Sequence, residues 1–440
     1  MAAAASLLSA CSAEPFAPNA APPSSFTSAG AVAGKHIKHV VIVVQENRTF
    51  DNLFYGFSGA HYAKYGLAHG RRIKLHAIGL IGPCLNNSWA ESIAAYDGKR
   101  MDGFDRNSFT CTRSGVVGDY VYSYVFRSEV APYWTMAQRY VLADHMFPTM
   151  FGNSFTGHLD LIAATASLSP STSEVDTPLA LPWNCNAPPG TKTSVLNAQR
   201  EETLGGGPFP CFTQFRTLAD TLDAKRISWK YYAPSVGNIG GQIWSEFGAI
   251  SNVRYGPDWS KVVTPQTRVL VDARDGRLPS VSWVIPDAVD SDHPVMGHTG
   301  PSWVAAVVNA IGNGPDWNST AIVVVWDDWG GWYDDLPPPQ LDYRGLGIRV
   351  PCIVISPYAR AGYVSHTRYE FGSVVKLVEE VFGLPVLGSS ASGYTDGRAN
   401  SMLDVFNFSR KPRAFSPIPA PKPASYFLNR PPSNLPPDDD

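Results

Sequence analysis

The sequence predicts an α/β fold, a three-layer α/β/α sandwich around a doubly wound, mostly parallel sheet with long loop insertions. Two apolar runs, at residues 40–44 and 322–325, consist of β-branched residues, which is typical of strands buried on both faces of a sheet. Segments of strand and helix character alternate along the chain, as in parallel sheets covered by helices. Polar side chains follow both apolar runs directly, at the edge where open α/β sheets bind their ligands.

Five segments have the composition of strands and four have the periodicity of helices. We expect strands at 37–44, 227–232, 281–285, 320–326 and 351–356, and helices near 129–140, 214–225, 301–313 and 370–382. The last helix is expected to stop at Gly383, shortly before Pro385. Residues 57–125 and 167–215 have little periodicity and many Gly, Pro, Asn and Ser residues. Long irregular segments of this kind are usually functional, so we expect both to frame the pocket.

Length and charge limit the organisation and the partners of the chain. Its 440 residues allow two or three domains, but the predicted strands contribute to one sheet and favour a single domain over 36–408. Residues 12–35 are rich in Ala, Pro and Ser and predict a flexible tether, while the proline-rich residues 409–440 predict an extended tail. The formal net charge of −3 gives no basic patch, so no nucleic-acid partner is expected.

The first eleven residues form a short apolar run that ends in Leu8-Ser9-Ala10-Cys11, which resembles a bacterial lipoprotein processing site. Acylated Cys11 would then anchor the protein to a membrane. The alternative is an ordinary apolar N-terminus. We expect an exported protein, either a periplasmic or cell-surface lipoprotein or a secreted one. No later segment has the ~18 uninterrupted apolar residues of a spanning helix.

Five further cysteines are consistent with export to an oxidising compartment. Two pairs lie in the loop-rich regions at similar spacing, so Cys84 with Cys111 and Cys185 with Cys211 are disulfide candidates, although the sequence leaves the connectivity open. Cys352 lies in an apolar strand and is expected to be a buried free thiol. The sequence has no CxxC spacing, which disfavours a thiolate zinc site.

Four oxygen-bearing side chains follow the two apolar runs: Glu46, Asn47, Asp327 and Asp328. If they converge, the carboxylates repel one another unless a cation holds them, which predicts a divalent metal ion. Oxygen ligands suit Ca, Mg or Mn, and a joining histidine would admit Zn. The alternative, polar residues that merely end strands in water, is disfavoured by the glycines and aromatics after Asp328. The pattern indicates a metal-dependent hydrolase.

Three ordered sequence blocks carry a family resemblance. They are residues 37–51, with Gln45-Glu46-Asn47-Arg48; residues 326–334, with Trp326-Asp327-Asp328-Trp329; and residues 349–367, from Arg349-Val350-Pro351 to His366-Thr367. Together they resemble the bacterial phosphoesterase family that includes non-haemolytic-type phospholipases C and an acid phosphatase branch, over roughly residues 36–385. The resemblance implies an alkaline phosphatase-like fold and a hydrolase of phosphoric ester bonds.

The resemblance also implies catalytic residues. Ser154, in Gly152-Asn153-Ser154, occupies the position of the family's nucleophile and would form a phosphoenzyme, although a helix-capping role is the ordinary interpretation of such a serine. His158 stands where phospholipases have an arginine, so we expect it to donate to a phosphoryl oxygen. His293, in Asp292-His293-Pro294, matches another family element and is expected to transfer a proton.

Three residues are expected to bind substrate. Asn87 stands where many relatives have a histidine before Ser-Trp, His366 lies in the third block, and Trp329 belongs to an aromatic cluster suited to a choline headgroup by cation–π contact or to core packing. The partner is expected to be a small phosphate ester or a phospholipid headgroup, so phospholipase C and acid phosphatase activities both stay open. The alternatives are a non-catalytic surface lipoprotein that keeps the fold as a binding module, and a sulfatase-like hydrolase, whose Cys/Ser-x-Pro/Ala-x-Arg motif is absent.

Overall fold

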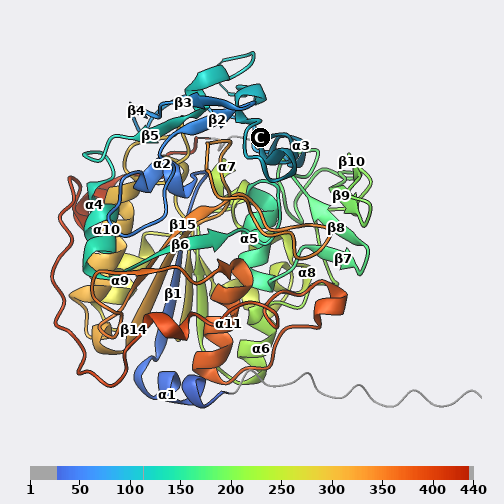
Figure 1. Cartoon of the computed structure of the whole chain (residues 1–440). Coiled ribbons are helices and arrows are strands. Elements are labelled where there is room, and N and C mark those ends of the chain that lie inside the picture. Colours follow the sequence, from blue (N-terminus) through green and yellow to red (C-terminus); the bar gives the residue numbers. More distant parts are fainter. Residues whose placement is uncertain (1–26, 112, 436–440) are drawn as a thin grey trace, which may run out of the picture.

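The computed structural model describes residues 27–111 and 113–435 (Figure 1). Cys11 and most of the predicted tether therefore lie outside the described residues. Among the described residues, no helix is both long and apolar enough to span a bilayer.

The core of the protein is a nine-stranded sheet, whose order is β12-β11-β13-β1-β14-β15-β6-β16, with β17 also paired to β6. β14 is fully buried and β1 is buried from Val40 onward, which explains the apolar runs in both strands. The strands are β1 (His39–Gln45), β6 (Val141–Phe147), β11 (Trp229–Tyr232), β12 (Val262–Val263), β13 (Val281–Val284), β14 (Thr320–Trp326), β15 (Val350–Ile355), β16 (Tyr363–Ser365) and β17 (Tyr369–Glu370).

One strand inside this sheet runs against the others. β15 is antiparallel to both β14 and β6, while the remaining pairs are parallel. The segment 327–349 between β14 and β15 contains no helix in the described structure, so the chain returns without the crossover that a parallel neighbour needs. Because β15 is the only reversal along this path, the carboxyl ends of β1, β14 and β6 lie at the same edge of the sheet.

Helices cover both faces of the sheet and complete the predicted three layers (Figure 1). On one face α1 packs on α11, α11 on α5 and α5 on α6, and on the other α10 contacts α4, α9 and α12. These helices are α1 (Ser28–His36), α4 (Ala131–Arg139), α5 (Ser154–Ala163), α6 (Leu218–Ala224), α9 (Arg268–Arg274), α10 (Gly300–Gly312), α11 (Phe371–Phe382) and α12 (Ala424–Asn429). As predicted, α11 stops at Gly383, which adopts a left-handed conformation with a φ of 62°.

The two loop-rich insertions contain small sheets that sequence periodicity did not reveal. Residues 57–125 hold two two-stranded pairs, and residues 167–215 hold a four-stranded antiparallel sheet. These strands, and the short helices that lie in or near the insertions, are β2 (Gly66–Ala68), β3 (Arg71–Ile73), β4 (His76–Ile78), β5 (Ser123–Val125), β7 (Ser167–Ser169), β8 (Thr172–Val175), β9 (Ser194–Asn197), β10 (Glu202–Thr203), α2 (Phe50–Phe54), α3 (Trp89–Tyr96), α7 (Ile239–Ile243) and α8 (Ser251–Arg254).

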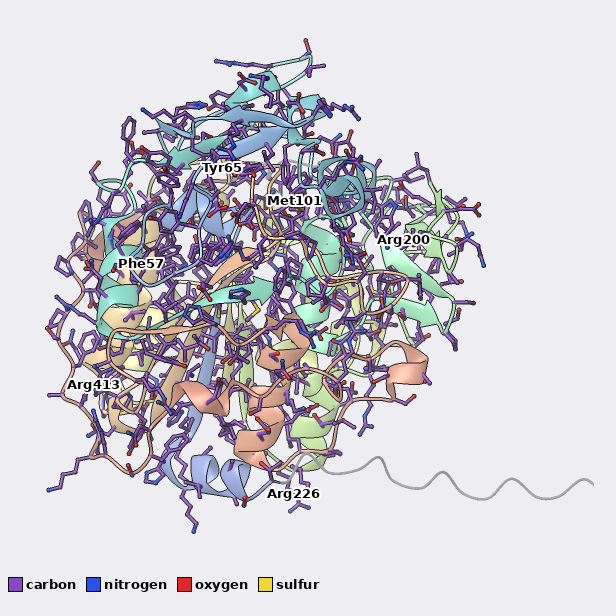
Figure 2. The ribbon with its side chains drawn as sticks, viewed as in Figure 1. Phe57, Tyr65, Met101, Arg200, Arg226 and Arg413 are labelled. Atoms are coloured by element: carbon purple, nitrogen blue, oxygen red, sulfur yellow. A yellow bond between two sulfur atoms is a disulfide. The ribbon has the colours of Figure 1, made fainter. Side chains whose placement is uncertain are left out.

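Both predicted terminal boundaries need correction. Residues 28–35, predicted as part of the tether, belong to α1, which packs so closely on α11 that a Cβ on Gly34 would lie 2.5 Å from the carbonyl oxygen of Val381. The tail is not a free extended segment, because residues 409–435 lie on the folded body. Arg413, labelled in Figure 2, donates to the backbone carbonyls of Arg139 (3.0 Å) and Ala359 (3.2 Å). Buried apolar side chains and backbone hydrogen bonds hold the tail despite its prolines.

Candidate active site

The ends of β1 and β14 bring the predicted metal ligands together. These strands pair in parallel with Gln45 opposite Trp326, so Glu46 and Asp327 emerge side by side. The N–H of Asp327 donates to the carbonyl of Gln45 (3.0 Å), and the N–H of Asn47 donates to Oδ1 of Asp327 (3.0 Å). The predicted convergence of the two clusters is thus a direct result of strand register.

A tight turn after Asp328 closes over this edge. Gly330 has a φ of 59°, and a Cβ there would lie 2.1 Å from the carbonyl oxygen of Asn47. Asn47 itself adopts a left-handed φ of 55°. Only glycine allows the second loop to approach the first so closely. The N–H of Gly330 then donates to Oδ1 of Asp328 at 2.7 Å and orients that carboxylate.

Ser154 reaches the same edge from β6, as the first residue of α5. Its Oγ lies 3.1 Å from Oδ2 of Asp328 and 3.3 Å from Oδ1 of Asn47. Gly157 allows this approach, because a Cβ there would lie 2.5 Å from the carbonyl oxygen of Asp327. The N-terminal end of α5, where the helix dipole favours negative charge, is therefore pressed against the carboxylates.

His158 follows Ser154 by about one helical turn and faces the same cluster. Its Nε2 lies 2.9 Å from Oε1 of Glu46 and 3.8 Å from Oδ2 of Asp327. Burial lowers the pKa of His158 to about 4, so the ring is neutral near pH 7. A neutral imidazole is a metal ligand, and this one joins the predicted oxygen set.

The carboxylates of the cluster resist ionisation in the absence of a cation. Burial, reinforced by the charge of Asp328, raises the pKa of Glu46 to about 8. Burial and neighbouring carboxylates likewise raise the pKa values of Asp327 and Asp328 well above the ordinary range. Among the described residues, Oε2 of Glu46 and Oδ2 of Asp327 have no hydrogen-bond partner. Buried orphan oxygens beside a neutral imidazole are a donor set that fits a divalent cation.

Asn87 and Trp329 both belong to the wall of this cluster. Nδ2 of Asn87 donates to Oδ1 of Asp328 (2.9 Å), and the indole N–H of Trp329 donates to the backbone carbonyl of Asn87 (3.1 Å). Trp329 is only 1% exposed and packs edge-on against Phe104. The neighbouring Trp326 and Trp332 are fully buried. These aromatic side chains pack inside the protein and support the loop. They therefore fit the core-packing alternative and do not form an open wall for cation–π contact.

His293, the predicted proton-transfer residue, is buried with 2% exposure. Its ring is 6.4 Å from that of Trp244, which in turn is 6.5 Å from the ring of His158. Its Nδ1 is 4.0 Å from Sγ of Cys84. Burial, helped by the charge of Arg48, lowers the pKa of His293 to about 3, so the imidazole is neutral near pH 7.

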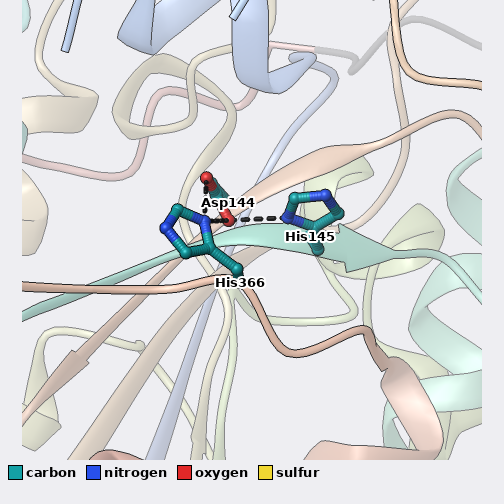
Figure 3. Close-up of side chains that lie close together, drawn as sticks. All are labelled: Asp144, His145 and His366. Atoms are coloured by element: carbon teal, nitrogen blue, oxygen red, sulfur yellow. Dashed lines mark hydrogen bonds and ion pairs between the residues drawn. The ribbon is translucent and has the colours of Figure 1, made fainter. Parts of the chain in front are cut away.

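His366 lies in a different group of polar residues. Its Nδ1 is 2.9 Å from Oδ2 of Asp144, a residue in the middle of β6 (Figure 3). His145 contacts the same carboxylate. Sequence reasoning missed this group because Asp144 and His145 interrupt the apolar pattern of β6, and the strand itself was not predicted.

A buried arginine, also missed from the sequence, connects the two loops that carry the cluster. Nε of Arg349 donates to Oδ1 of Asp334 (3.0 Å), and its Nη2 lies 3.4 Å from Oδ1 of Asp51. Its Nη1 donates to the backbone carbonyl of Asp144 (2.9 Å). Arg349 and Asp334 both lie in the blocks of the family resemblance, which was the only available signal. The arginine fixes the segments that follow β1 and β14 to β6.

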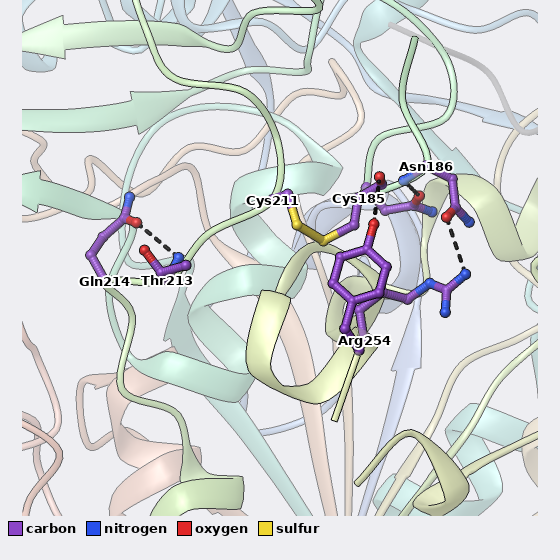
Figure 4. The surroundings of a disulfide bond; sticks show 8 residues. Cys185, Asn186, Cys211, Thr213, Gln214 and Arg254 are labelled. Carbon is purple, nitrogen blue, oxygen red and sulfur yellow. Dashed lines mark hydrogen bonds between the residues drawn. A yellow bond between two sulfur atoms is a disulfide. The ribbon is translucent and has the colours of Figure 1, made fainter. Parts of the chain in front are cut away.

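Both predicted disulfides are present, Cys84–Cys111 and Cys185–Cys211, and Cys352 is buried and unpaired in the described structure. Figure 4 shows the second bridge. The first lies just before Asn87 and therefore restrains a segment of the site.

The two insertions meet beside Asn87. The backbone N–H of Trp89, from the first insertion, donates to Oδ1 of Asp176 in the second at 2.8 Å. This placement agrees with the expectation that both insertions frame the site.

Comparisons with known proteins relate the chain to a family. The sequence profile of the Phosphoesterase family matches residues 37–385. Phospholipase C A of Mycobacterium tuberculosis is 25% identical over 439 residues, covering 87% of this chain and 79% of that protein. Non-hemolytic phospholipase C of Pseudomonas aeruginosa is also 25% identical over 439 residues, covering 85% of this chain and 58% of that protein. A solved structure of a protein in the alkaline phosphatase superfamily from Vibrio parahaemolyticus has a TM-score of 0.37 and 10% identity, covering 84% of this chain and 71% of that one.

The family match includes the ends of both β1 and β14, which carry the clustered carboxylates, and it confirms the resemblance found in the sequence. The chain belongs to the Phosphoesterase family and is a hydrolase of phosphoric ester bonds.

Proposed function

We propose that the protein cleaves phosphate esters through a Ser154 phosphoenzyme, with a divalent cation held by Glu46, Asn47, Asp327 and Asp328. The observation that carries the proposal is the contact of Ser154 Oγ with Asp328 and Asn47 inside a buried cluster that contains orphan oxygens. His158 is added as a ligand on the basis of its contact with Glu46. A nitrogen ligand makes Zn a candidate beside Ca, Mg and Mn.

The residues of the site divide the chemistry among them. When bound, the cation would neutralise phosphoryl charge and lower the pKa of the serine hydroxyl. Asp328 and Asn47 hold Ser154 Oγ in place, and the N-terminus of α5 favours the negative charge that develops there. Ser154 passes its hydroxyl proton to the contacting carboxylate of Asp328 and bonds to phosphorus, while the ester oxygen leaves and takes up a proton from solvent. Water then cleaves the serine–phosphate bond and regenerates the hydroxyl.

We further propose a phospholipase C-type substrate, in which the bond to a phosphorylated headgroup is cleaved. The support is that the relatives include Phospholipase C A and a non-hemolytic phospholipase C. Selection of choline by Trp329 has no support in the geometry, because that ring is buried. A phosphate monoester is the second substrate class that the test must separate.

The test measures p-nitrophenol release from p-nitrophenyl phosphorylcholine, p-nitrophenyl phosphate and p-nitrophenyl sulfate, with and without chelator. We expect chelator-sensitive cleavage of the phosphorylcholine ester and a fall in kcat of at least about 10³-fold in Ser154→Ala. Ser171→Ala, at an exposed turn, is the matched control and should behave as wild type. Preference for the monoester would indicate a phosphatase, and cleavage of the sulfate a sulfatase. A fully active Ser154→Ala variant would refute the phosphoenzyme, and no turnover of any ester would favour a binding module.

Export is part of the proposal, supported by two disulfides that need an oxidising compartment. Anchoring through Cys11 is tested by fractionation. The Cys11→Ser variant should leave the membrane fraction, and an unchanged distribution would contradict a lipid anchor.

A further inference from the structure

A second cluster of potential metal ligands lies on β6, separate from the carboxylates around Ser154. Oδ1 of Asp144 is 2.7 Å from Nδ1 of His145, and Oδ2 of Asp144 is 2.9 Å from Nδ1 of His366 (Figure 3). These three side chains can each offer one ligand atom, with all of the ligand atoms within 4.8 Å of one another. His61 completes the surroundings, because its backbone N–H donates to Oδ2 of Asp144 at 2.8 Å.

Strand register explains why residues so distant in sequence meet here. β16 pairs with β6 with Ser365 opposite Ala143, and β17 resumes with Tyr369 opposite Met146. Between these pairs the later segment contains one more residue than β6, so it cannot continue in simple register. An irregularity of this kind re-aims side chains. It places His366 beside Asp144 at the edge of the sheet.

Hydrogen bonds from neighbouring residues offset the burial of the Asp144 carboxylate. Burial opposes ionisation of Asp144, but the hydrogen bonds from His145 and from the His61 backbone lower its pKa below the ordinary value. The nearby guanidinium of Arg349 donates to the backbone carbonyl of Asp144 and to the carboxylate of Asp334. A buried carboxylate thus faces two ring nitrogens. The side chains of His145 and His366 are 25% and 60% exposed, respectively.

We propose that Asp144, His145 and His366 bind a divalent transition cation of the zinc type. Two imidazole nitrogens and one carboxylate oxygen are a common donor set for such ions, and the exposed side leaves a position for water. Each imidazole would ligate through Nδ1, with its proton on Nε2. Tetrahedral zinc separates its ligand atoms by about 3.3 Å. The ring nitrogens of His145 and His366 now lie 2.7 Å and 3.0 Å from Oδ1 of Asp144, so both contacts would lengthen when the ion binds.

The ion would fasten the segment between β16 and β17 to β6. Asp144 comes from the strand that leads to Ser154, and Arg349 connects its backbone to Asp334. The cluster is therefore a structural site beside the catalytic one, and it does not depend on the proposed reaction. His61, whose ring centroid is 6.1 Å from that of His145, is a further histidine close to the cluster.

The experiment isolates this site by disabling the other. In a Glu46→Gln/Asp327→Asn host, equilibrium dialysis with Zn²⁺ and visible spectra with Co²⁺ should show one bound ion per chain. Adding His145→Gln and His366→Gln should weaken Zn²⁺ binding by at least about 100-fold. That loss exceeds the usual effect of removing a residue that only hydrogen-bonds to a metal ligand. His76→Gln, at an exposed histidine outside the cluster, is the matched control and should leave binding unchanged. Circular dichroism verifies that each variant is folded.

A second measurement needs no substitution at the cluster. Zn²⁺ should protect His366 of the host from diethyl pyrocarbonate, read by mass spectrometry, and should not protect His76. The proposal is overturned if the host binds no Zn²⁺, if the histidine substitutions leave its affinity unchanged, or if His366 is modified equally with and without the ion. Each of these results is independent of ester hydrolysis.

Discussion

At the scale of single residues, the site is a collection of groups that are unfavourable without a cation. Glu46, Asp327 and Asp328 are almost completely buried and adjacent, so burial and mutual repulsion both oppose their ionisation. His158 is neutral for the same reason, since burial disfavours its charged form. A bound divalent cation would offset the burial and the mutual repulsion of these carboxylates, because its positive charge favours their ionised form.

The first prediction concerns Glu46→Gln. In chelator at pH 8, we expect this variant to unfold at a higher temperature than wild type, because it removes one of three repelling carboxyl groups. A divalent cation at a hundred times its dissociation constant for wild type should raise the unfolding free energy of wild type by about 2.7 kcal/mol. The same cation concentration should raise that of the variant much less. Differential scanning calorimetry at constant ionic strength measures both. Equal cation-induced shifts in the two proteins would exclude Glu46 as a ligand.

A role for His293 in proton transfer stays a prediction. If the buried ring acts on the leaving alcohol, His293→Ala should lower kcat by about 10²-fold and change the dependence on leaving-group pKa. If it only fills space behind Trp244, the variant should lose stability while that dependence stays as in wild type. Rates with phenyl phosphate esters of graded leaving-group pKa distinguish the two.

At the scale of elements, three strand ends and one helix assemble the site. β1 and β14 supply the carboxylates, and β6 delivers α5 with Ser154 at its first position. Close backbone approaches at Gly157 and Gly330 set how deeply these elements interlock. The precision of the site therefore depends on packing between elements as much as on the ligands themselves.

The second prediction concerns Gly157→Ala. The added methyl group would meet the carbonyl oxygen of Asp327 at 2.5 Å and push α5 away from the carboxylates. We expect a loss of roughly 1–3 kcal/mol in unfolding free energy and a lower affinity for the activating cation. Gly397→Ala is the control, because nothing lies within 4 Å of the position that its methyl group would take. Urea unfolding and metal titration of activity check the prediction, and a Gly157→Ala variant that behaves as wild type would show that α5 can shift freely.

The third prediction compares the two disulfides, whose sequence separations of 27 and 26 are nearly equal. Replacing either cysteine pair by serine should lower the unfolding free energy by about 3 kcal/mol, because the closed loops are of similar length. Only loss of Cys84–Cys111 should also reduce kcat at temperatures where the protein is folded, since that bridge adjoins Asn87. Equal activities of the two double variants would contradict this assignment.

At the scale of the whole molecule, long-range contacts extend well beyond the site. The tail returns over α10, with Phe427 of α12 against Trp303, and α1 packs on α11. Ionisable groups are buried far from the site as well. Glu379 of α11 is fully buried, and burial together with the neighbouring Asp396 raises its pKa to about 10.

The fourth prediction is a loss of stability on the alkaline side that originates at Glu379. A raised pKa in the folded state means that the stabilising contribution is complete below about pH 4.5 and is lost as the pH rises through about 10. Between pH 5 and 9, wild type should therefore lose up to about 1.4 kcal/mol per pH unit relative to Glu379→Gln. Exposed Glu201→Gln is the control and should track wild type. Denaturant unfolding across this range measures the differences, and parallel curves for wild type and Glu379→Gln would contradict the prediction.

Local patterns in the sequence determined the class of fold and most of the candidate site. Each of these signals lies within a few neighbouring residues. They are the apolar runs of β1 and β14, the helix stop at Gly383, the polar pairs after the two strands and the family blocks. Ser154 needed the resemblance, because an isolated serine at a helix start carries no specific signal. The spacing of the cysteines predicted the candidate pairs, and the structure gave their connectivity.

Tertiary structure alone decided the rest. Pairing between distant segments sets the reversed direction of β15, identifies β6 despite its central Asp144 and His145, and folds the tail onto the body. It also places His158 on Glu46 and His366 on Asp144, which sequence spacing could not distinguish from contacts with substrate. The physical reason is that periodicity and capping are local properties, whereas register, burial and the pairing of charges depend on which segments meet.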